Sequence, residues 1–556
     1  MLSYRKLAMR VLGRPLHTGG GIDSPRPASQ RAAALVLTAA LLTGAAFPAF
    51  AGTYYIEDGD IVISAGTETG TNKVEQGGTL KSENDKDTII TNHDKDKASS
   101  NTVTIDANGK NDKVEVTLKD VNIDASRGSE AAVSVTGKGD TTIELDGDNE
   151  LKSGAGHAGL EHNKTDTSGE LTIQDKDNNG SLEAAGGFKG AGIGSAGSND
   201  AQVKITGGNI TATSDDWGAG IGSGSYGTGT VEITGGEINA TGGYLGAGIG
   251  GGCNGSGNVT ISGGTITAAG SDGAAGIGGG YYNGATVTIT GDAVIKNASS
   301  TKYGAGIGGG NGSDGNVTIS GNAKIENATG GYGAAGIGGG AFSSPDKIGN
   351  GNVVIKDNAK IDNVQGGAYG AGIGGGIYGL SNVTIEGNTK VNATGGAGGA
   401  AIGGGAGAEN NSDNNGNQIT IKSNENGSPT INAVGGGTDE GEKIVIGGAG
   451  IGAGCESNAD ADITLEGKVT ITATAGKDNV AIGANGIEQE FSGLAEGSSI
   501  TRYDPEGNDI TLPTDPVPAV PSSSGGSSAD ASVQESVFPG LVVTDKDGQR
   551  ISYTST

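Results

Sequence analysis

The stretch Gly246-Ala247-Gly248-Ile249-Gly250-Gly251-Gly252 recurs along the chain, intact or degenerate, and it decides the fold. Ten copies can be anchored on their isoleucine, at Ile193, Ile221, Ile249, Ile277, Ile307, Ile337, Ile373, Ile402, Ile451 and Ile482. Successive isoleucines are 28, 28, 28, 30, 30, 36, 29, 49 and 31 residues apart. A period of this length indicates an array of units, each of which buries its apolar face against its neighbours.

Each unit contains short strands and no helical pattern. Residues 230–234 and 237–241 alternate apolar and polar side chains, so Val231 and Ile233 face one side and Glu232 faces the other. With the glycine motif as a third strand, one unit fits one coil of a parallel β-helix. We therefore predict an all-β fold, a right-handed parallel β-helix (solenoid) of about ten to fourteen coils with roughly 28–30 residues per coil.

The two ends of the chain differ in composition from the repeats. Basic residues and an apolar run precede Ala49-Phe50-Ala51, which predicts a secretory signal peptide over 1–51 and a secreted protein that is released or associated with the cell surface. Composition then predicts four further segments. These are an N-terminal cap region (52–100), the β-helix repeats (101–495), a Pro/Ser/Gly-rich linker (496–536) and a partial C-terminal β segment (537–556).

The chain is strongly acidic, with 35 Lys+Arg against 63 Asp+Glu and a formal net charge of −28. Without residues 1–51 the balance is 29 against 62, a formal charge of −33. Such a surface repels nucleic acid and anionic lipid, so we predict neither as a partner. The apolar run near the N-terminus is too short to span a bilayer comfortably, and no membrane span is predicted in the mature chain.

Two further repeated features have structural interpretations. Cys253 and Cys455 lie six repeat steps apart, roughly 29 Å if each step is one coil, which is too far for a disulfide between them. Asn297, Asn327 and Asn363 each follow an isoleucine by two residues. This spacing predicts an inward ladder of stacked side-chain amides that satisfies buried backbone groups.

The glycine motif predicts a binding face. Alternation directs Ala247 and Ile249 inward and the glycines outward, so the stacked motifs are expected to form an exposed strip of bare backbone. Every aromatic residue between 186 and 380 lies four or five residues before or after a motif isoleucine: Phe188, Trp217, Tyr244, Tyr303, Tyr332 and Tyr369 before it, and Tyr226, Tyr281, Tyr282, Phe342 and Tyr378 after it.

Stacking the coils would turn these offsets into two columns that flank the glycine strip. Pyranose rings stack on aromatic side chains and their hydroxyls bind polar groups, so the columns predict binding of a polysaccharide. A purely structural role stays open, in which the rings stack on one another and cover coil edges. Packing of the strip against a second copy of the chain is another alternative.

An acidic turn suggests a cation site. Asp175, Asp177 and Asn179 stand at the first, third and fifth positions of a calcium-loop pattern, and Gly180 follows, but the twelfth position is Gly186 instead of glutamate. The half-match favours an irregular Ca²⁺ site over an EF-hand, and Ca²⁺ is the one cofactor considered. No organic cofactor is predicted.

Catalysis is not predicted. Polysaccharide lyases and hydrolases need a basic residue or a carboxylate cluster for proton transfer. The chain has no arginine between Arg127 and Arg502, and the histidines in that stretch are His157 and His162. An enzyme would have to work through carboxylates alone, with Asp215 and Asp216 as candidates.

The repeats resemble a known family. The pattern of Thr-Val-Thr-Ile, Ser-Gly-Gly-Thr-Ile-Thr-Ala and Gly-Ala-Gly-Ile-Gly-Gly-Gly over roughly residues 102–482 is similar to secreted clostridial and related Gram-positive β-helix proteins, grouped as calcium-containing carbohydrate-binding domains. The resemblance implies non-catalytic binding of plant-wall or uronic-acid polysaccharides, with Ca²⁺ in turns. We therefore expect a polysaccharide-binding β-helix. The alternatives are an adhesin or structural surface protein that binds proteins or itself and, third, a polysaccharide lyase or hydrolase.

Overall fold

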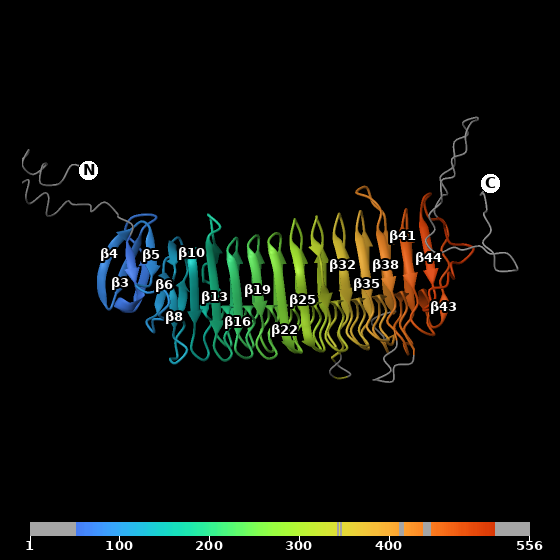
Figure 1. Ribbon diagram of the computed structural model, residues 1–556, viewed down its shortest axis with the longest axis horizontal. Helices are drawn as coiled ribbons and strands as arrows, with labels where there is room; N and C mark the ends of the chain where they lie inside the picture. The colour runs from blue at the N-terminus through green and yellow to red at the C-terminus, as the bar shows by residue number, and fades with distance from the viewer. Residues whose placement is uncertain (1–51, 342–343, 345–346, 411–415, 438–445, 518–556) are drawn as a thin grey trace, which may run out of the picture. The chain divides into compact units, whose positions relative to one another are not determined.

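The structure is a computed structural model that describes residues 52–341, 344, 347–410, 416–437 and 446–517. The predicted signal peptide, Phe342 and the predicted C-terminal segment lie outside these residues. The described residues all belong to one compact unit, which extends to Val517. This unit is a right-handed parallel β-solenoid of about 13 turns, as predicted (Figure 1).

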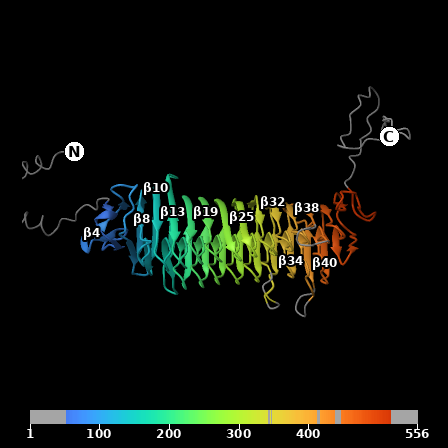
Figure 2. The ribbon, with the colours of Figure 1, turned by 60° about the horizontal axis from the view of Figure 1, so that its bottom comes forward.

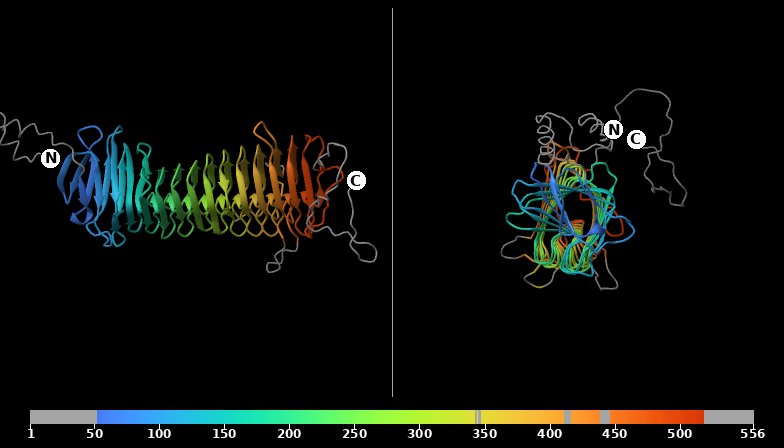
Figure 3. Two further views of the ribbon diagram at one scale, coloured as in Figure 1. Left: turned by 45° about the horizontal axis from the view of Figure 1, so that its top comes forward. Right: turned by 90° about the vertical axis from the view of Figure 1, so that its left-hand side faces the viewer.

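Between residues 113 and 484, each coil contributes to all three parallel sheets, which surround a common interior (Figure 3). The chain passes from sheet A through sheet C to sheet B and then rises to sheet A of the next coil. Equivalent residues lie in register, so Val231 pairs with Val259 and Ile233 with Ile261. The apolar members of every strand therefore stack on identical or similar residues along the interior.

Sheet A contains the valine–isoleucine strands: β1 (Thr53–Tyr55), β5 (Thr88–Thr91), β7 (Lys113–Lys119), the first part of β10 (Asp140–Lys152), β12 (Leu171–Gln174), β15 (Asp200–Ile205), β18 (Gly229–Ile233), β21 (Gly257–Ile261), β24 (Ala285–Ile289), β27 (Gly315–Ile319), β31 (Gly351–Ile355), β34 (Ser381–Glu386), β37 (Asn417–Lys422) and β40 (Ala461–Glu466). Sheet C follows it in each coil and contains β8 (Asn122–Asp124), the second part of β10, β13 (Gly180–Gly186), β16 (Asn209–Ser214), β19 (Glu237–Thr241), β22 (Thr265–Asp272), β25 (Val294–Lys302), β28 (Lys324–Ile325), β29 (Ala328–Thr329), β32 (Lys360–Gln365), β35 (Lys390–Thr394), β38 (Thr430–Val434), β41 (Thr470–Thr474) and β44 (Ser499–Tyr503).

Sheet B is built mostly from two-residue strands at the glycine motif: β14 (Ile193–Gly194), β17 (Ile221–Gly222), β20 (Ile249–Gly250), β23 (Ile277–Gly278), β26 (Ile307–Gly308), β30 (Ile337–Gly338), β33 (Ile373–Gly374), β36 (Ile402–Gly403), β39 (Ile451–Gly452) and β42 (Ile482–Ala484). Longer strands precede them, namely β2 (Ile61–Ala65), β3 (Asn72–Gln76), β4 (Thr79–Asp85), β6 (Val103–Ala107), β9 (Val133–Gly137) and β11 (Leu160–Lys164), and β43 (Ile487–Glu488) follows. The described part of the chain has one 3-10 helix, η1 (Ile56–Asp58), and no helix long and apolar enough to cross a membrane.

Both ends of the solenoid are closed by non-repetitive segments. At the N-terminal end, β3 pairs antiparallel with β2 and with β4. At the C-terminal end, β44 adds a strand to sheet C beside β41, so the stack continues past the boundary expected at residue 495. The fully buried Arg502 side chain binds Glu488 and Asp515 there, which places residues up to 517 in the cap and not in a linker.

The asparagine ladder exists, but its side chains face outward. The Asn363 amide donates to Asn327 Oδ1 at 3.1 Å, and both side chains contact solvent. The physical reason is a bulge: two residues, Lys296 and Asn297, stand between the inward Ile295 and Ala298, which breaks the alternation. The prediction of an inward ladder is therefore wrong.

Candidate functional site: aromatic residues beside the glycine arches

The glycine motif folds as a tight arch instead of an extended strand. In the coil of Ile249, the amide of Ala247 donates to the carbonyl of Gly251 at 3.0 Å, and the same bond recurs from Ala275 to Gly279. The isoleucine at the top of the arch is fully buried and points into the core. The glycines of the arch are buried as well, so the predicted exposed strip of bare backbone does not exist.

Close backbone packing explains why the arch consists of glycine. A Cβ atom on Gly248 would lie 2.7 Å from the amide nitrogen of Ala269 and 3.0 Å from the carbonyl oxygen of Ala240, both in sheet C. Gly250 has a φ of 129°, a conformation that side chains rarely adopt. The glycines therefore let sheet B lie directly against the neighbouring backbone and are not a ligand surface.

The arch brings its two flanks together. The amide of Cys253, which follows one motif, donates to the carbonyl of Trp217, which precedes the motif of the coil before it, at 2.7 Å. Tyr281 and Leu245 form the same bond at 3.1 Å. The aromatic residues before and after the motif are consequently neighbours on one edge of the solenoid, instead of walls on either side of a strip.

Two positions on this edge have left-handed backbone conformation in coil after coil. The position four residues before the isoleucine is aromatic at Trp217, Tyr303 and Tyr369, with φ of 65°, 66° and 72°. The position five residues after it is aromatic at Tyr226, Tyr282 and Tyr378, with φ of 67°, 62° and 62°. In other coils the same two positions are held by glycine, at Gly273, Gly333, Gly398, Gly312 and Gly407, or by other left-handed residues, at Lys189, Leu245, Asp478, Ser198, Asn254 and Glu456. The recurrence shows that the arch geometry, and not the aromatic side chain, imposes this conformation.

The rings form local groups along this edge. Phe188 lies 5.4 Å from Trp217 between ring centroids, and Tyr332 makes edge contacts with Tyr303 at 6.1 Å and Tyr369 at 5.6 Å. The rings of Tyr281 and Tyr282 lie 3.8 Å apart, and their hydroxyls are 2.7 Å apart. Of these aromatic residues that the structure describes, five have exposed side chains: Phe188 (43%), Tyr226 (57%), Tyr244 (52%), Tyr332 (41%) and Tyr378 (43%).

In the described part of the chain, three lysines contact these rings, and the spacing of the glycine motif did not predict them. Lys189 Nζ lies 5.2 Å from the Phe188 centroid and 5.3 Å from that of Trp217. Lys302 lies over Tyr303 at 4.8 Å, and Lys347 over Tyr282 at 4.1 Å. The edge therefore combines exposed aromatic faces with positive charge on an otherwise acidic protein.

The acidic turn is a separate feature, on the turn between sheets A and C. Carboxylate oxygens of Asp175, Asp177 and Glu144 lie within 4.8 Å of one another. The two Asp175 oxygens already accept backbone amides of Asn179 and Gly180 at 3.2 and 3.0 Å. Asn179 donates its side-chain amide to Asp177 at 3.4 Å. The sequence analysis did not predict Glu144. The register between coils could have identified it, because Glu144 pairs with Gln174, the residue directly before Asp175.

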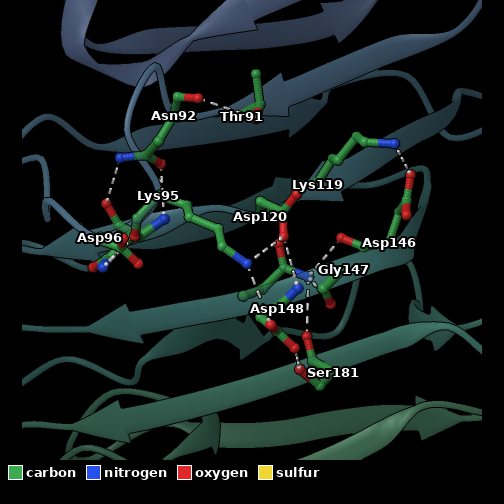
Figure 4. A network of polar contacts seen from close by, with 12 residues as sticks. Thr91, Asn92, Lys95, Asp96, Lys119, Asp120, Asp146, Gly147, Asp148 and Ser181 are labelled. Carbon is green, nitrogen blue, oxygen red and sulfur yellow. Dashed lines mark hydrogen bonds and ion pairs between the residues drawn. The ribbon is translucent and has the colours of Figure 1, made fainter.

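Lysines neutralise this acidic corner from coil to coil. Lys176 Nζ lies 3.4 Å from Glu144, and Lys119 lies 2.6 Å from Asp146. Nearer the N-terminus, Lys95 reaches between Asp120 and Asp148, at 3.7 and 3.6 Å (Figure 4). A cation at this corner would have to compete with these ammonium groups.

Comparison with known proteins agrees with the fold. The profile of the Beta helix repeat family matches residues 203–225, 231–253, 259–281 and 317–341. Each match runs from the first inward valine of sheet A to a position four residues after the motif isoleucine, so one match spans nearly one coil. Neither a curated protein nor a solved structure matches the chain significantly. The repeat matches and the stacked parallel coils together identify the chain as a β-helix repeat protein.

Proposed function

We propose that this protein binds an extracellular polysaccharide without altering it, through the aromatic residues at the edge of the glycine arches. The observation that carries the proposal is the left-handed backbone of Trp217, Tyr226, Tyr303 and Tyr369. A non-glycine residue in this conformation costs roughly 1–2 kcal/mol. Neighbouring coils satisfy the same positions with glycine, as at Gly273 and Gly312, so the fold does not need aromatic side chains there.

Aromatic residues that are both strained and exposed, such as Tyr226 and Tyr378, favour a role in binding. The Tyr226 side chain is 57% exposed and that of Tyr378 is 43% exposed. A stabilising role would be expected to bury these rings, because burial of apolar area is what stabilises the fold. Exposed rings at a repeated position suit a polymer that offers the same apolar C–H face at regular intervals.

The chemistry of the edge suits a sugar chain. Pyranose rings would stack on the tyrosines, while hydroxyls would bind phenolic groups and the lysines that lie over the rings. The acidic surface disfavours anionic partners elsewhere, and Lys189, Lys302 and Lys347 supply the positive charge at this edge. Secretion, with release or cell-surface association, is part of the same proposal and follows from the predicted signal peptide.

A glycan array probed with the full chain tests the proposal. The variant Trp217→Gly/Tyr226→Gly/Tyr303→Gly/Tyr369→Gly removes four rings and gives each position the residue that its backbone prefers. Its matched control is Leu245→Gly, because Leu245 has the same left-handed conformation, with a φ of 66°, and no aromatic ring. We expect the parent and the control to bind the same polysaccharide and the quadruple variant to lose binding.

The alternatives give different results in the same experiment. No binding by the parent on the array, with or without Ca²⁺, would contradict the proposal and favour an adhesin or structural surface protein. Release of reducing ends or unsaturated products from a bound polysaccharide would favour a hydrolase or lyase. Equal binding by the parent and the quadruple variant would assign the rings to structure.

A further inference from the structure

Two adjacent columns of outward residues on sheet A carry no charge over a long stretch of the solenoid. From β21 to β37, two columns of outward residues run across six coils in strand register. One column contains Asn258, Thr286, Asn316, Asn352, Asn382 and Gln418, and the other contains Thr260, Thr288, Thr318, Val354, Thr384 and Thr420. We call these twelve residues the neutral face; β34, one of its strands, is labelled in Figure 2.

Charged residues flank the neutral face on the same sheet. Lys204 and Glu232 form an ion pair at 3.2 Å on the coils before it, and Asp462 lies on the coil after it. Along one side lie Lys356, Glu386 and Lys422, of which Glu386 and Lys422 pair at 3.3 Å. Sheet C, by comparison, presents Lys324 and Lys360, which both bind Asp362. The absence of charge is therefore specific to these two columns and is not a general feature of the outward residues of the solenoid.

We propose that the neutral face binds a second copy of this chain, side by side, in a two-fold dimer. Absence of charge matters most for a partner that is itself acidic, because two surfaces of the same sign repel each other. With a net charge of −28, another copy of the chain is such a partner. A neutral sugar would gain nothing from the absence of charge, and the twelve residues of the face include no aromatic ring for it to stack on.

The side chains of the face are self-complementary. A carboxamide has two donor hydrogens and an acceptor oxygen, so it can bind an identical group. Asn352 already donates to Asn316 within the column at 2.9 Å, which leaves further donor and acceptor capacity directed outward. Columns of asparagine and threonine on two facing sheets can interdigitate, as in steric zippers. Hollows of about 320 Å³ around Thr260 and Thr288 and about 600 Å³ around Asn382 and Gln418 give such side chains room. Glu232 also lines the first hollow, and Asp460 and Asp462 line the second, so carboxylates stand at the two ends of the face.

The size of the face predicts a weak dimer. Six coils span about 29 Å at about 4.8 Å each, and a five-residue strand is about 16 Å long. The interface would bury about 500 Å² per partner, near the lower limit for a specific interface. Repulsion between the two acidic chains opposes association, so added salt should strengthen the dimer by screening that repulsion.

Sedimentation equilibrium of the full chain tests the proposal, from about 1 to about 200 µM and in low and high NaCl. The test variant is Thr288→Glu/Thr318→Glu, which places two charges on adjacent coils of the neutral face. The control is Thr213→Glu/Thr241→Glu, on adjacent coils of sheet C. Both variants change the net charge equally, and thermal unfolding checks that both fold.

We expect the mean mass of the parent and of the control to rise with concentration toward that of two chains, and to rise further in high salt. The test variant should stay a single chain under the same conditions. A parent that remains a single chain throughout would overturn the proposal. Equal association by both variants, or loss of association only in the control, would place the contact elsewhere. Binding of a neutral glucan that only the test variant loses, without dimers, would make the face a sugar site.

Discussion

The guanidinium of Arg502 lies fully buried against the Asp515 carboxylate, and it donates from Nε and Nη2 to the two oxygens at 2.7 and 2.9 Å. The same guanidinium binds Glu488 and donates to the carbonyl of Gln489 at 2.7 Å. These contacts join β42, β43 and β44 to the segment that ends the solenoid. The buried ion pair of Arg502 and Asp515 therefore closes the C-terminal end of the core.

Arg502→Met should destabilise the C-terminal coils by about 3–5 kcal/mol, because it leaves the Asp515 carboxylate buried without its partner. The measurement is amide hydrogen exchange, since a solenoid can open one coil at a time. We expect lost protection in β41 and β44 and unchanged protection in β18 and β21. The double variant Arg502→Met/Asp515→Asn should recover part of the protection, and unchanged exchange in β44 of the single variant would contradict the cap.

Gly248→Ala should destabilise the fold by about 1–3 kcal/mol, because the added methyl group meets the sheet C backbone and cannot be accommodated by a side-chain movement. Gly437→Ala is the control: Gly437 is exposed, and nothing lies within 4 Å of the added atom. Urea unfolding monitored by circular dichroism compares the two. Equal stability of both variants would show that the arch is not closely packed.

Tyr226→Gly should leave stability unchanged within about 1 kcal/mol, because relief of the left-handed backbone offsets the flexibility that glycine adds to the unfolded chain. Tyr332→Ala is different: Tyr332 contacts both Tyr303 and Tyr369 by ring edges, and each such contact contributes about 0.5–1.5 kcal/mol. Thermal unfolding should therefore show a lower midpoint for Tyr332→Ala alone. A large loss of stability in Tyr226→Gly would support a structural role for the exposed ring.

The stability of the solenoid should fall as the pH decreases below about 6.5. Burial lowers the pKa of His162, whose Nδ1 lies 3.0 Å from the carbonyl of Gln202, so the folded chain favours the neutral ring. The His162 ring therefore takes up its proton at a higher pH in the unfolded chain than in the folded chain. As the pH falls below the pKa of the unfolded chain, protonation favours unfolding and the free energy of unfolding decreases. His162→Val, which matches the paired Val135, should flatten the dependence of the thermal midpoint on pH between about 7 and 5. An identical pH dependence in parent and variant would contradict this assignment.

Calcium should bind weakly at Glu144, Asp175 and Asp177, whose oxygens are close enough to share an ion. Lys176 competes for Glu144, so Lys176→Gln should increase the effect of Ca²⁺ on the thermal midpoint, and Asp177→Asn should abolish it. Mg²⁺ at the same concentration is the ionic-strength control. If Ca²⁺ shifted the thermal midpoints of the parent, Lys176→Gln and Asp177→Asn equally, the effect would be non-specific screening and the site would be contradicted.

The sequence predicts the coil, the three strands and the inward isoleucines, because a strict period and alternation leave few other ways to bury Val231, Ile233 and Ile249. The alternation of inward and outward residues gave wrong predictions where the backbone is not an extended strand. It could not reveal that Gly248 and Gly250 form an arch, or that a bulge turns Asn297 outward. These features depend on contacts between neighbouring coils, which a single repeat does not encode.

The candidate site was predictable in composition but not in geometry. The offsets of Trp217, Tyr244 and Tyr303 placed the aromatic residues next to the glycine motif, but in a column separate from the rings that follow the motif, whereas both sets lie on one edge of the solenoid. Their left-handed backbone and the neighbouring Lys189 and Lys302 emerge only when coils are stacked. The cap around Arg502 and Asp515 was missed for a similar reason, since a proline-rich composition resembles a linker until its buried partners are known.

The register of the coils has a mechanical consequence. Backbone hydrogen bonds between coils, such as that from Ile249 to Gly276, point along the stacking direction. Tension applied along that direction would load the bonds at one boundary between coils and peel the end coil away, leaving the next boundary intact until its turn. The solenoid would therefore unfold coil by coil and lengthen in small steps under tension, instead of unfolding in a single event.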